Sequence, residues 1–464
     1  MKDKLLEKIV SYVEKSRDLI FRVERHIWEN PEIGYKEWKT TEFLQKIFEE
    51  LGYKVEPAGD IPGFIAQIDT GKPGPCVAIV AELDSLLCPE HPEANPRTGA
   101  VHACGHHCQS AYLVGCASAF AQPGALDGLC GSIRFMGVPA EETIDLEYRN
   151  SLIEQGKIHY VAGKVEFLYR GLFDGVDLVL FAHALNNEKR LFAIDEGSDG
   201  CITKHFEFVG KSAHAGCAPH EGINSLYAAT VAFTACNAMR ETFEEKDYVR
   251  FHPIITNGGV AANAIPGVTK LDTYVRASTF DVMIKINKKM NRAISAAAAS
   301  MGANALIHDI PGNMPLINDK QLSRLCKETV EEIFGQNCLT EKPWNCGTSD
   351  LGDISCLMPT IHPYMGGAEG TAHGADYYIT DPVKACVNPA KMLSGMTVKL
   401  LEDGGKLGNK IVSEYQPVFR NKQDYFQAID GIKMKKQTVI YHDDGKITLD
   451  YKNGQAENCR KETK

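Results

Sequence analysis

Residues 76–81 form an unbroken apolar run, CVAIVA, which constrains the fold more than any other stretch of the chain. A strand with one face in water alternates apolar and polar side chains, so an unbroken run predicts a strand buried on both faces. Helical patterns at 38–51 and about 110–120 flank it in sequence, and a second apolar run follows at 133–138. This alternation predicts an α/β sheet covered by helices on both faces.

The pattern changes near residue 197. Strand patterns follow at 202–209, 251–256, 268–275 and 304–309, and helical patterns at 224–243 and 282–300. Their order along the chain is β-α-β-β-α-β. This order is that of a ferredoxin-like unit. We therefore predict a discontinuous catalytic domain (1–196 and 310–403), an inserted domain (197–309) and a C-terminal extension (404–464).

Two local predictions concern the ends of the chain. Residues 3–29 place apolar side chains at helical spacing and predict one long amphipathic helix. Residues 438–451 contain two strand-like runs around a Gly-containing turn, which predicts a β-hairpin in the extension.

The composition excludes several classes of protein. Apolar residues make up 44% of the 464 residues and charged residues 24%. The sequence contains no run of about 18 apolar residues, the length that a membrane-spanning helix needs. A net charge of −10 without a basic stripe argues against nucleic-acid binding. The charged N-terminal residues do not resemble a signal peptide, and 15 cysteines without a paired framework suit a reducing compartment. We expect a cytoplasmic protein.

Residues able to carry chemistry follow the predicted strands or lie in Gly-rich turns. The stretch 101–108, VHACGHHC, places a thiol and an imidazole two residues apart, and the other groups end apolar runs or follow a Gly-rich loop. In α/β sheets, sites form where strands end. The residues concerned are Cys104, His106, Glu141, Glu142, His183 and His373.

These residue types are those that bind transition metals. Zn²⁺ and its neighbours take thiolate, neutral imidazole and carboxylate ligands, and a catalytic site leaves one position open. Five ligands exceed what one open site needs, so two metals sharing a water fit better. One glutamate of the adjacent pair is then available as general base.

In these motifs the chain resembles the aminoacylase and glutamate-carboxypeptidase family of dinuclear metallopeptidases. Within that family it is most similar to the amidohydrolase subfamily with a His-Ala-Cys-Gly-His motif. That subfamily includes indole-acetyl-amino-acid hydrolases, hippurate hydrolases, p-aminobenzoyl-glutamate hydrolase subunits and β-alanyl-lysine dipeptidases. The likeness covers about residues 5–400, and residues 347–353 look most like the glutamate-hydrolase and dipeptidase branch. It implies a zinc-peptidase-like α/β/α catalytic domain whose inserted domain serves as a lid and for dimerisation.

The resemblance also implies roles for individual residues. It implies two divalent ions, Zn or Mn, held by Cys104, His106, Glu142, His183 and His373. It makes Glu141 the general base and Asp84 a supporting acid, and it makes His214 a group that reaches the active site of the partner subunit. Asn263 and Arg276 resemble the site for the substrate carboxylate. His107 and Glu82 depart from the subfamily, which usually has Asp or Asn and Asp at these positions.

Each residue also has an ordinary structural explanation. Buried cysteines, hydrogen-bonded histidines and solvated glutamate pairs are common, and Arg276 could be a surface arginine of a sheet. The combination favours a homodimeric, metal-dependent amidohydrolase that cleaves the amide bond of an N-acyl or N-aroyl amino acid, a small-molecule substrate. The alternatives are a cytoplasmic dipeptidase of the β-alanyl-lysine type and a non-catalytic subunit of a hydrolase complex. We expect no nucleic-acid or membrane partner.

Overall fold

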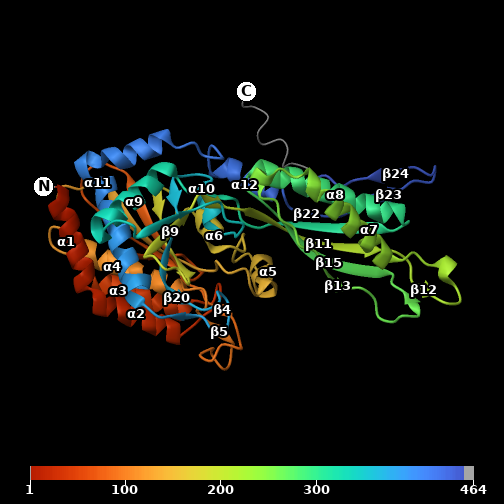
Figure 1. The fold of residues 1–464 in the computed structure, drawn as a ribbon, viewed down its shortest axis with the longest axis horizontal. Helices are drawn as coiled ribbons and strands as arrows, with labels where there is room; N and C mark the ends of the chain where they lie inside the picture. Colours follow the sequence, from red (N-terminus) through yellow and green to blue (C-terminus); the bar gives the residue numbers. More distant parts are fainter. Residues whose placement is uncertain (1, 454–464) are drawn as a thin grey trace. The chain divides into compact units, whose positions relative to one another are not determined.

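The structure is a computed structural model that describes residues 2–453. The chain divides into two compact units (Figure 1). The first unit contains the described residues up to Gly197, Ile317–Trp344 and Asp353–Val418, and the second contains Ser198–Leu316, Asn345–Gly352 and the described residues from Phe419 onward. Both units are therefore built from separate stretches of sequence.

A six-stranded sheet forms the centre of the first unit, and its central strand is the one predicted from the apolar run. Strand β3 (Cys76–Glu82) is buried along its whole length and pairs in parallel with β6 (Ser132–Val138) and β7 (Leu178–Leu180). The sheet order is β1 (Val55–Pro57), β2 (Phe64–Asp69), β6 (Ser132–Val138), β3 (Cys76–Glu82), β7 (Leu178–Leu180) and β19 (Thr360–Ile361). The prediction of a buried central strand is confirmed.

Helices pack around this sheet and supply most of the hydrophobic core. The N-terminal helices pack against α4 (His106–Phe120) and α11 (Asn388–Glu414), and α9 (Lys320–Phe334) packs against α11. The helices of this unit are α1 (Lys2–Lys15), α2 (Arg17–Glu29), α3 (Trp38–Glu50), α4 (His106–Phe120), α5 (Leu146–Glu154), α6 (Gly163–Tyr169), α9 (Lys320–Phe334), α10 (Leu351–Ser355, which begins in the second unit) and α11 (Asn388–Glu414).

The prediction of one helix over residues 3–29 is wrong, because the chain bends at Ser16. Ser16 has φ −88° and ψ 6°, which ends α1 and begins α2. Its hydroxyl bonds to the Tyr12 carbonyl oxygen at 3.0 Å and to the Ser118 hydroxyl at 2.7 Å. A serine that bonds back to the preceding turn bends a helix, and the apolar spacing does not reveal this.

A second sheet of the first unit carries part of the predicted site. It contains β18 (Leu339–Lys342), β9 (Phe192–Asp195), β20 (Pro363–Glu369) and β21 (Tyr378–Ile379), and β8 (His183–Asn186) also pairs with β20. His183 is thus the first residue of β8 rather than the end of the preceding strand. The loop with His373 joins β20 to β21.

The second unit contains the predicted ferredoxin-like arrangement. Its sheet has the order β13 (Ile254–Asn257), β15 (Val268–Ala277), β11 (Gly200–Val209), β16 (Asn304–Pro311) and β22 (Met434–Gln437). Helices α7 (Ser225–Ala238) and α8 (Phe280–Ser300) pack against β11 and β15. The β-α-β-β-α-β order is confirmed, and β22 adds a fifth strand from the C-terminal part of the chain.

Residues 404–464, predicted as an extension, are distributed over both units. The end of α11 lies in the first unit, whereas α12 (Lys422–Asp430), β22 and the hairpin of β23 (Val439–Tyr441) and β24 (Ile447–Leu449) lie in the second. The predicted hairpin is confirmed, and residues 454–464 lie outside the described residues. Within the described part of the chain, no helix is long and apolar enough to cross a membrane.

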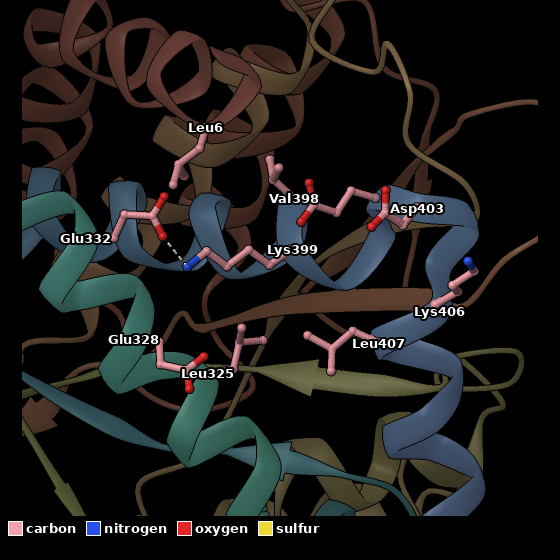
Figure 2. Close-up of a pocket in the computed structure, with 10 residues that line it drawn as sticks. Leu6, Leu325, Glu328, Glu332, Val398, Lys399, Asp403, Lys406 and Leu407 are labelled. Carbon is pink, nitrogen blue, oxygen red and sulfur yellow. Dashed lines mark hydrogen bonds and ion pairs between the residues drawn. The ribbon is translucent and has the colours of Figure 1, made fainter. Parts of the chain in front are cut away.

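A cavity of about 340 Å³ lies between α1, α9 and α11 (Figure 2). Leu6, Leu325 and Leu407 give it an apolar lining, and Glu332 pairs with Lys399 at its edge. None of the residues predicted to carry chemistry lines this cavity. This cavity is therefore separate from the predicted site.

Candidate metal centre

The turn that carries Cys104 and His106 depends on a glycine. Gly105 has φ 89° and precedes α4, so that His106 is the first residue of the helix. A Cβ atom at Gly105 would lie 2.6 Å from both the Ala184 Cβ and the Tyr377 hydroxyl oxygen. Only glycine combines this backbone conformation with so close an approach, and the turn places both side chains at one point.

The structure brings the five predicted metal ligands together in two groups. The ligand atoms of Cys104, His106 and His183 lie within 4.8 Å of one another, and so do those of Cys104, Glu142 and His373. The Cys104 sulfur is 3.5 Å from the His183 Nε2, and the His373 Nε2 is 3.3 Å from the Glu142 Oε1. Cys104 belongs to both groups, so its thiol stands between two possible metal positions.

Neighbouring acceptors orient the rings of the buried His106 and the half-buried His183. The His106 Nδ1 lies 2.9 Å from the Asp84 carbonyl oxygen and 3.2 Å from the Asp84 Oδ1, and the His183 Nδ1 lies 2.8 Å from the Ala184 carbonyl oxygen. Each Nδ1 is thereby the protonated nitrogen, and each Nε2 faces the thiol group. The buried His106 Nε2 makes no hydrogen bond, and the Glu82 Oε2 lies 3.1 Å from it. A hydrogen bond from the other ring nitrogen commonly fixes the orientation of a metal-binding histidine.

Asp84 also holds the carboxylate pair in place. Its Oδ2 accepts a hydrogen bond from the Glu142 backbone N–H at 2.9 Å. The side chain is fully buried. The role of a supporting acid, expected for Asp84, therefore has a geometric basis in contacts to both His106 and Glu142.

The electrostatics of these groups fit a divalent cation. Burial raises the pKa of the Cys104 thiol and of the Glu142 carboxyl, and it lowers the pKa of His183 to about 4. Burial also favours neutral His106, but the Glu82 and Cys104 charges raise its pKa. Without a cation, burial opposes the thiolate and the carboxylate. A divalent ion would stabilise both and would bind the neutral imidazoles, so the donor set is that of a transition-metal site.

Glu141 differs from Glu142 in its exposure. Its side chain is 16% exposed, whereas that of Glu142 is 9% exposed. The Glu141 Oε2 lies 3.9 Å from the His106 Nε2, and its ligand atom groups with those of Glu82 and His106 within 4.8 Å. Glu141 is therefore next to the metal groups and is the more accessible carboxylate of the pair.

The two departures from the subfamily have buried partners. The Glu82 carboxylate lies 2.5 Å from the Lys164 Nζ and accepts a hydrogen bond from the Gln109 amide at 2.7 Å. The neighbouring Lys164 lowers the pKa of Glu82 in spite of its burial. Lys164 thus balances the charge of the buried glutamate at Oε1, while Oε2 lies 3.1 Å from the His106 Nε2.

The His107 Nε2 lies 3.3 Å from the Glu24 Oε1. Sequence reasoning missed Glu24 and Lys164. Glu24 could have been found, because it is a charged residue on the apolar stripe of α2. Lys164 gave no signal, because the stretch around it has no regular pattern.

The remaining predicted residues lie in the second unit. His214, on β12 (Ala213–His214), is exposed, and its Nδ1 accepts hydrogen bonds from the backbone N–H groups of Gly216 at 3.2 Å and Cys217 at 3.1 Å. Its proton is therefore on Nε2. The carbonyl oxygen of Asn263 accepts from the Ala215 N–H at 2.9 Å, beside the same strand.

Arg276 lies near the C-terminal end of β15. The turn that follows β14 (Ala264–Ile265) leads into the opposite, N-terminal end of the same strand. The Arg276 Nη1 donates to the Cys346 carbonyl oxygen at 2.8 Å, and the guanidinium lies 4.6 Å from the centre of the Tyr274 ring. The structure therefore brings His214 and Asn263 onto neighbouring segments but places Arg276 apart from them.

The chain is similar to known peptidases and amino acid hydrolases. A family model described as the peptidase dimerisation domain matches residues 197–301. An Xaa-Arg dipeptidase of Mus musculus is 27% identical over 396 residues, covering 80% of this chain and 82% of the relative. An IAA-amino acid hydrolase of Arabidopsis thaliana is 25% identical over 407 residues, covering 84% and 87%. The crystal structure of a dinuclear metal-binding peptidase of the M20 family from Bacillus subtilis aligns with a TM-score of 0.67 at 21% identity, covering 84% and 99%.

The contacts of Asp84 predict a specific effect on metal binding. Asp84→Ala is expected to lower the affinity for Zn²⁺ or Mn²⁺ about 10- to 100-fold, because His106 and the Glu142 backbone lose their acceptor. Competition with a chromophoric chelator measures this affinity. Asp177→Ala is the matched control, since Asp177 accepts from the Cys76 backbone N–H at 2.8 Å at the other end of β3. Equal affinities of the two variants would contradict the role of Asp84.

Proposed function

We propose that the chain, which is similar to metallopeptidases and amidohydrolases of the M20 family, hydrolyses the amide bond of an N-acyl or N-aroyl amino acid, p-aminobenzoyl-glutamate being one such amide. The observation that carries this proposal is the convergence of two ligand groups on Cys104 with Glu141 beside them. Cys104, His106, Glu142, His183 and His373 would hold two divalent ions, Zn or Mn. Bound divalent metal supplies an activated water and polarises the substrate carbonyl.

Glu141 is the group that moves the proton. Its partial exposure allows it to reach a water at the site, and its position 3.9 Å from the His106 Nε2 keeps it next to the metal ligands. It accepts the proton of the attacking water and then donates it to the leaving amine. Glu142 is less suited to this role, because it is buried and its Oε1 lies against the His373 ring.

His214 stabilises the negative charge that develops on the carbonyl oxygen. Because its Nδ1 accepts two backbone hydrogen bonds, the exposed ring presents an Nε2–H donor. A fixed donor of this kind is what an oxyanion requires. We infer that this histidine acts in the active site of the partner subunit of a homodimer.

The exposed edge of the second unit supports a homodimer. Edge strand β13 is exposed at all four residues and carries Ile254 and Ile255. On α7, Tyr227 and Val231 are also exposed. An unpaired edge with apolar side chains is suited to pairing with a second copy of the same strand.

Arg276 and Asn263 would recognise the substrate carboxylate. The guanidinium of Arg276 donates through Nη1 to the Cys346 carbonyl oxygen, which restrains its orientation. Paired N–H donors match the two oxygens of a carboxylate. The amide of Asn263 would add a further donor.

The second candidate function is that of a dipeptidase. The similarity to an Xaa-Arg dipeptidase favours it, because such an enzyme also cleaves an amide bond next to an amino acid. A non-catalytic subunit is disfavoured, because the ligand set and Glu141 are complete.

All cysteines in the described part of the chain are free thiols, which supports a cytoplasmic location.

Replacement of the proposed general base gives the first test. Glu141→Gln is expected to lower kcat at least about 10²-fold, because the amide cannot accept the proton of the water. Steady-state hydrolysis and metal analysis by inductively coupled plasma mass spectrometry are the measurements. The variant should retain two metals per chain. Loss of a metal would make Glu141 a ligand and would contradict its role as base.

A complementation experiment tests the exchange of His214 between subunits. His214→Ala and Glu141→Gln homodimers should each be inactive, but co-expression should restore about a quarter of the wild-type activity, because half of the random dimers are mixed and each has one intact site. Purification through two different tags isolates the mixed dimer. If the mixed dimer is as inactive as its parents, or if a monomeric variant is fully active, the assignment of His214 is wrong.

A further inference from the structure

We infer that the loop of residues 34–37, between α2 and α3, is a positioning clamp that fixes the backbone on both sides of Glu141. This inference rests on the proposed function, in which Glu141 is the general base and Glu142 is a metal ligand. The loop begins at Gly34, the glycine of a turn that also contains Pro31, and it contains none of the residues assigned a chemical role.

Side chains hold all four backbone groups of the two residues that flank Glu141. The Glu37 Oε1 accepts from the Ala140 N–H at 2.8 Å, and the Asp84 Oδ2 accepts from the Glu142 N–H at 2.9 Å. Arg149 donates through Nη1 to the Ala140 carbonyl oxygen at 3.2 Å and through Nη2 to the Glu142 carbonyl oxygen. Ala140 has φ 58°, a conformation that a residue with a Cβ rarely adopts, so the turn needs such support.

The same loop also holds the start of α5, from which Arg149 extends. The Lys36 Nζ lies 2.8 Å from the Asp145 Oδ2 and 4.2 Å from the centre of the Tyr148 ring. The Tyr35 ring lies 5.7 Å from the Arg149 guanidinium. The loop therefore contacts the carboxylate turn directly through Glu37 and indirectly through the helix that carries Arg149.

Gly34 allows these contacts to form. A Cβ atom at Gly34 would lie 2.3 Å from the Arg149 Nη2 and 3.0 Å from the Ala140 Cα. The Arg149 side chain is fully buried and ends at this point. The absence of a side chain at Gly34 thus lets a guanidinium and the carboxylate turn pack against one loop.

The consequence for catalysis is geometric. The loop contacts the backbone of the turn and helix α5 rather than a predicted metal ligand side chain, so it acts through the placement of Glu141 and Glu142. A displacement of a catalytic group by about 1 Å can lower the rate about 10²-fold. We therefore expect loss of the clamp to lower kcat far more than it raises KM.

Variants of Glu37 test the clamp directly. Glu37→Met removes the acceptor of the Ala140 N–H at similar volume, whereas Glu37→Gln keeps a carbonyl oxygen at the same reach. For Glu37→Met we expect kcat to fall about tenfold or more with KM changed less than about threefold, and for Glu37→Gln near-normal kinetics. Hydrogen–deuterium exchange of the peptide that contains residues 140–142 should become faster in Glu37→Met but not in Glu37→Gln.

Lys36 provides a test on the surface in case Glu37→Met does not fold. Lys36→Met should lower kcat by about threefold and accelerate exchange at residues 140–142. Lys327→Met is the control, because the Lys327 side chain is as exposed as that of Lys36 and forms an ion pair with Glu341 at 2.6 Å, and it should change neither. Unchanged kcat and exchange in Lys36→Met, or normal kcat in a folded Glu37→Met, would overturn the clamp.

The exchange measurement separates this inference from the proposed function. If the wild-type protein with two bound metals cleaves no amide, the proposed function fails, and exchange at residues 140–142 still decides whether the loop fixes the turn. If the wild type is active and the variants lose activity only in proportion to their unfolded fraction, the clamp fails and the proposed function stands.

Discussion

The candidate site depends on Asp84, a buried carboxylate that joins two parts of the first unit. One oxygen lies against the His106 ring at the start of α4, and the other accepts from the Glu142 backbone after β6. Asp84 itself follows the buried strand β3. A rigid central strand thus sets the distance between the imidazole and the carboxylate pair, and a thiol shared by both ligand groups lies between them.

Much of this arrangement could be predicted from the sequence, because the relevant signals are local. The apolar run of β3 indicated a buried strand, and Gly105 lies in a turn that only glycine could form so tightly. The five predicted ligands do converge. Part of this convergence follows from the topology, because Glu142 follows β6 and His183 follows β7, and both strands pair in parallel with β3.

Other features could not be predicted, because they depend on contacts between distant residues. The bend at Ser16 depends on a bond to Ser118, and the buried charge of Glu82 depends on Lys164, 82 positions later. The contribution of β22 to the sheet of the second unit depends on pairing with β16. Periodicity in one segment contains no information about such partners, so the predicted C-terminal extension could not be divided between the two units.

The central claim is that metal held by these residues cleaves an amide. The most direct test is hydrolysis of a panel after loading with Zn²⁺ or Mn²⁺, with p-aminobenzoyl-glutamate, hippurate, N-acetyl amino acids and β-alanyl dipeptides followed by mass spectrometry. The account predicts chelator-sensitive cleavage of at least one class at the amide bond. Two bound metals with no cleavage of any class, or cleavage that persists with chelator and without metal, would contradict it.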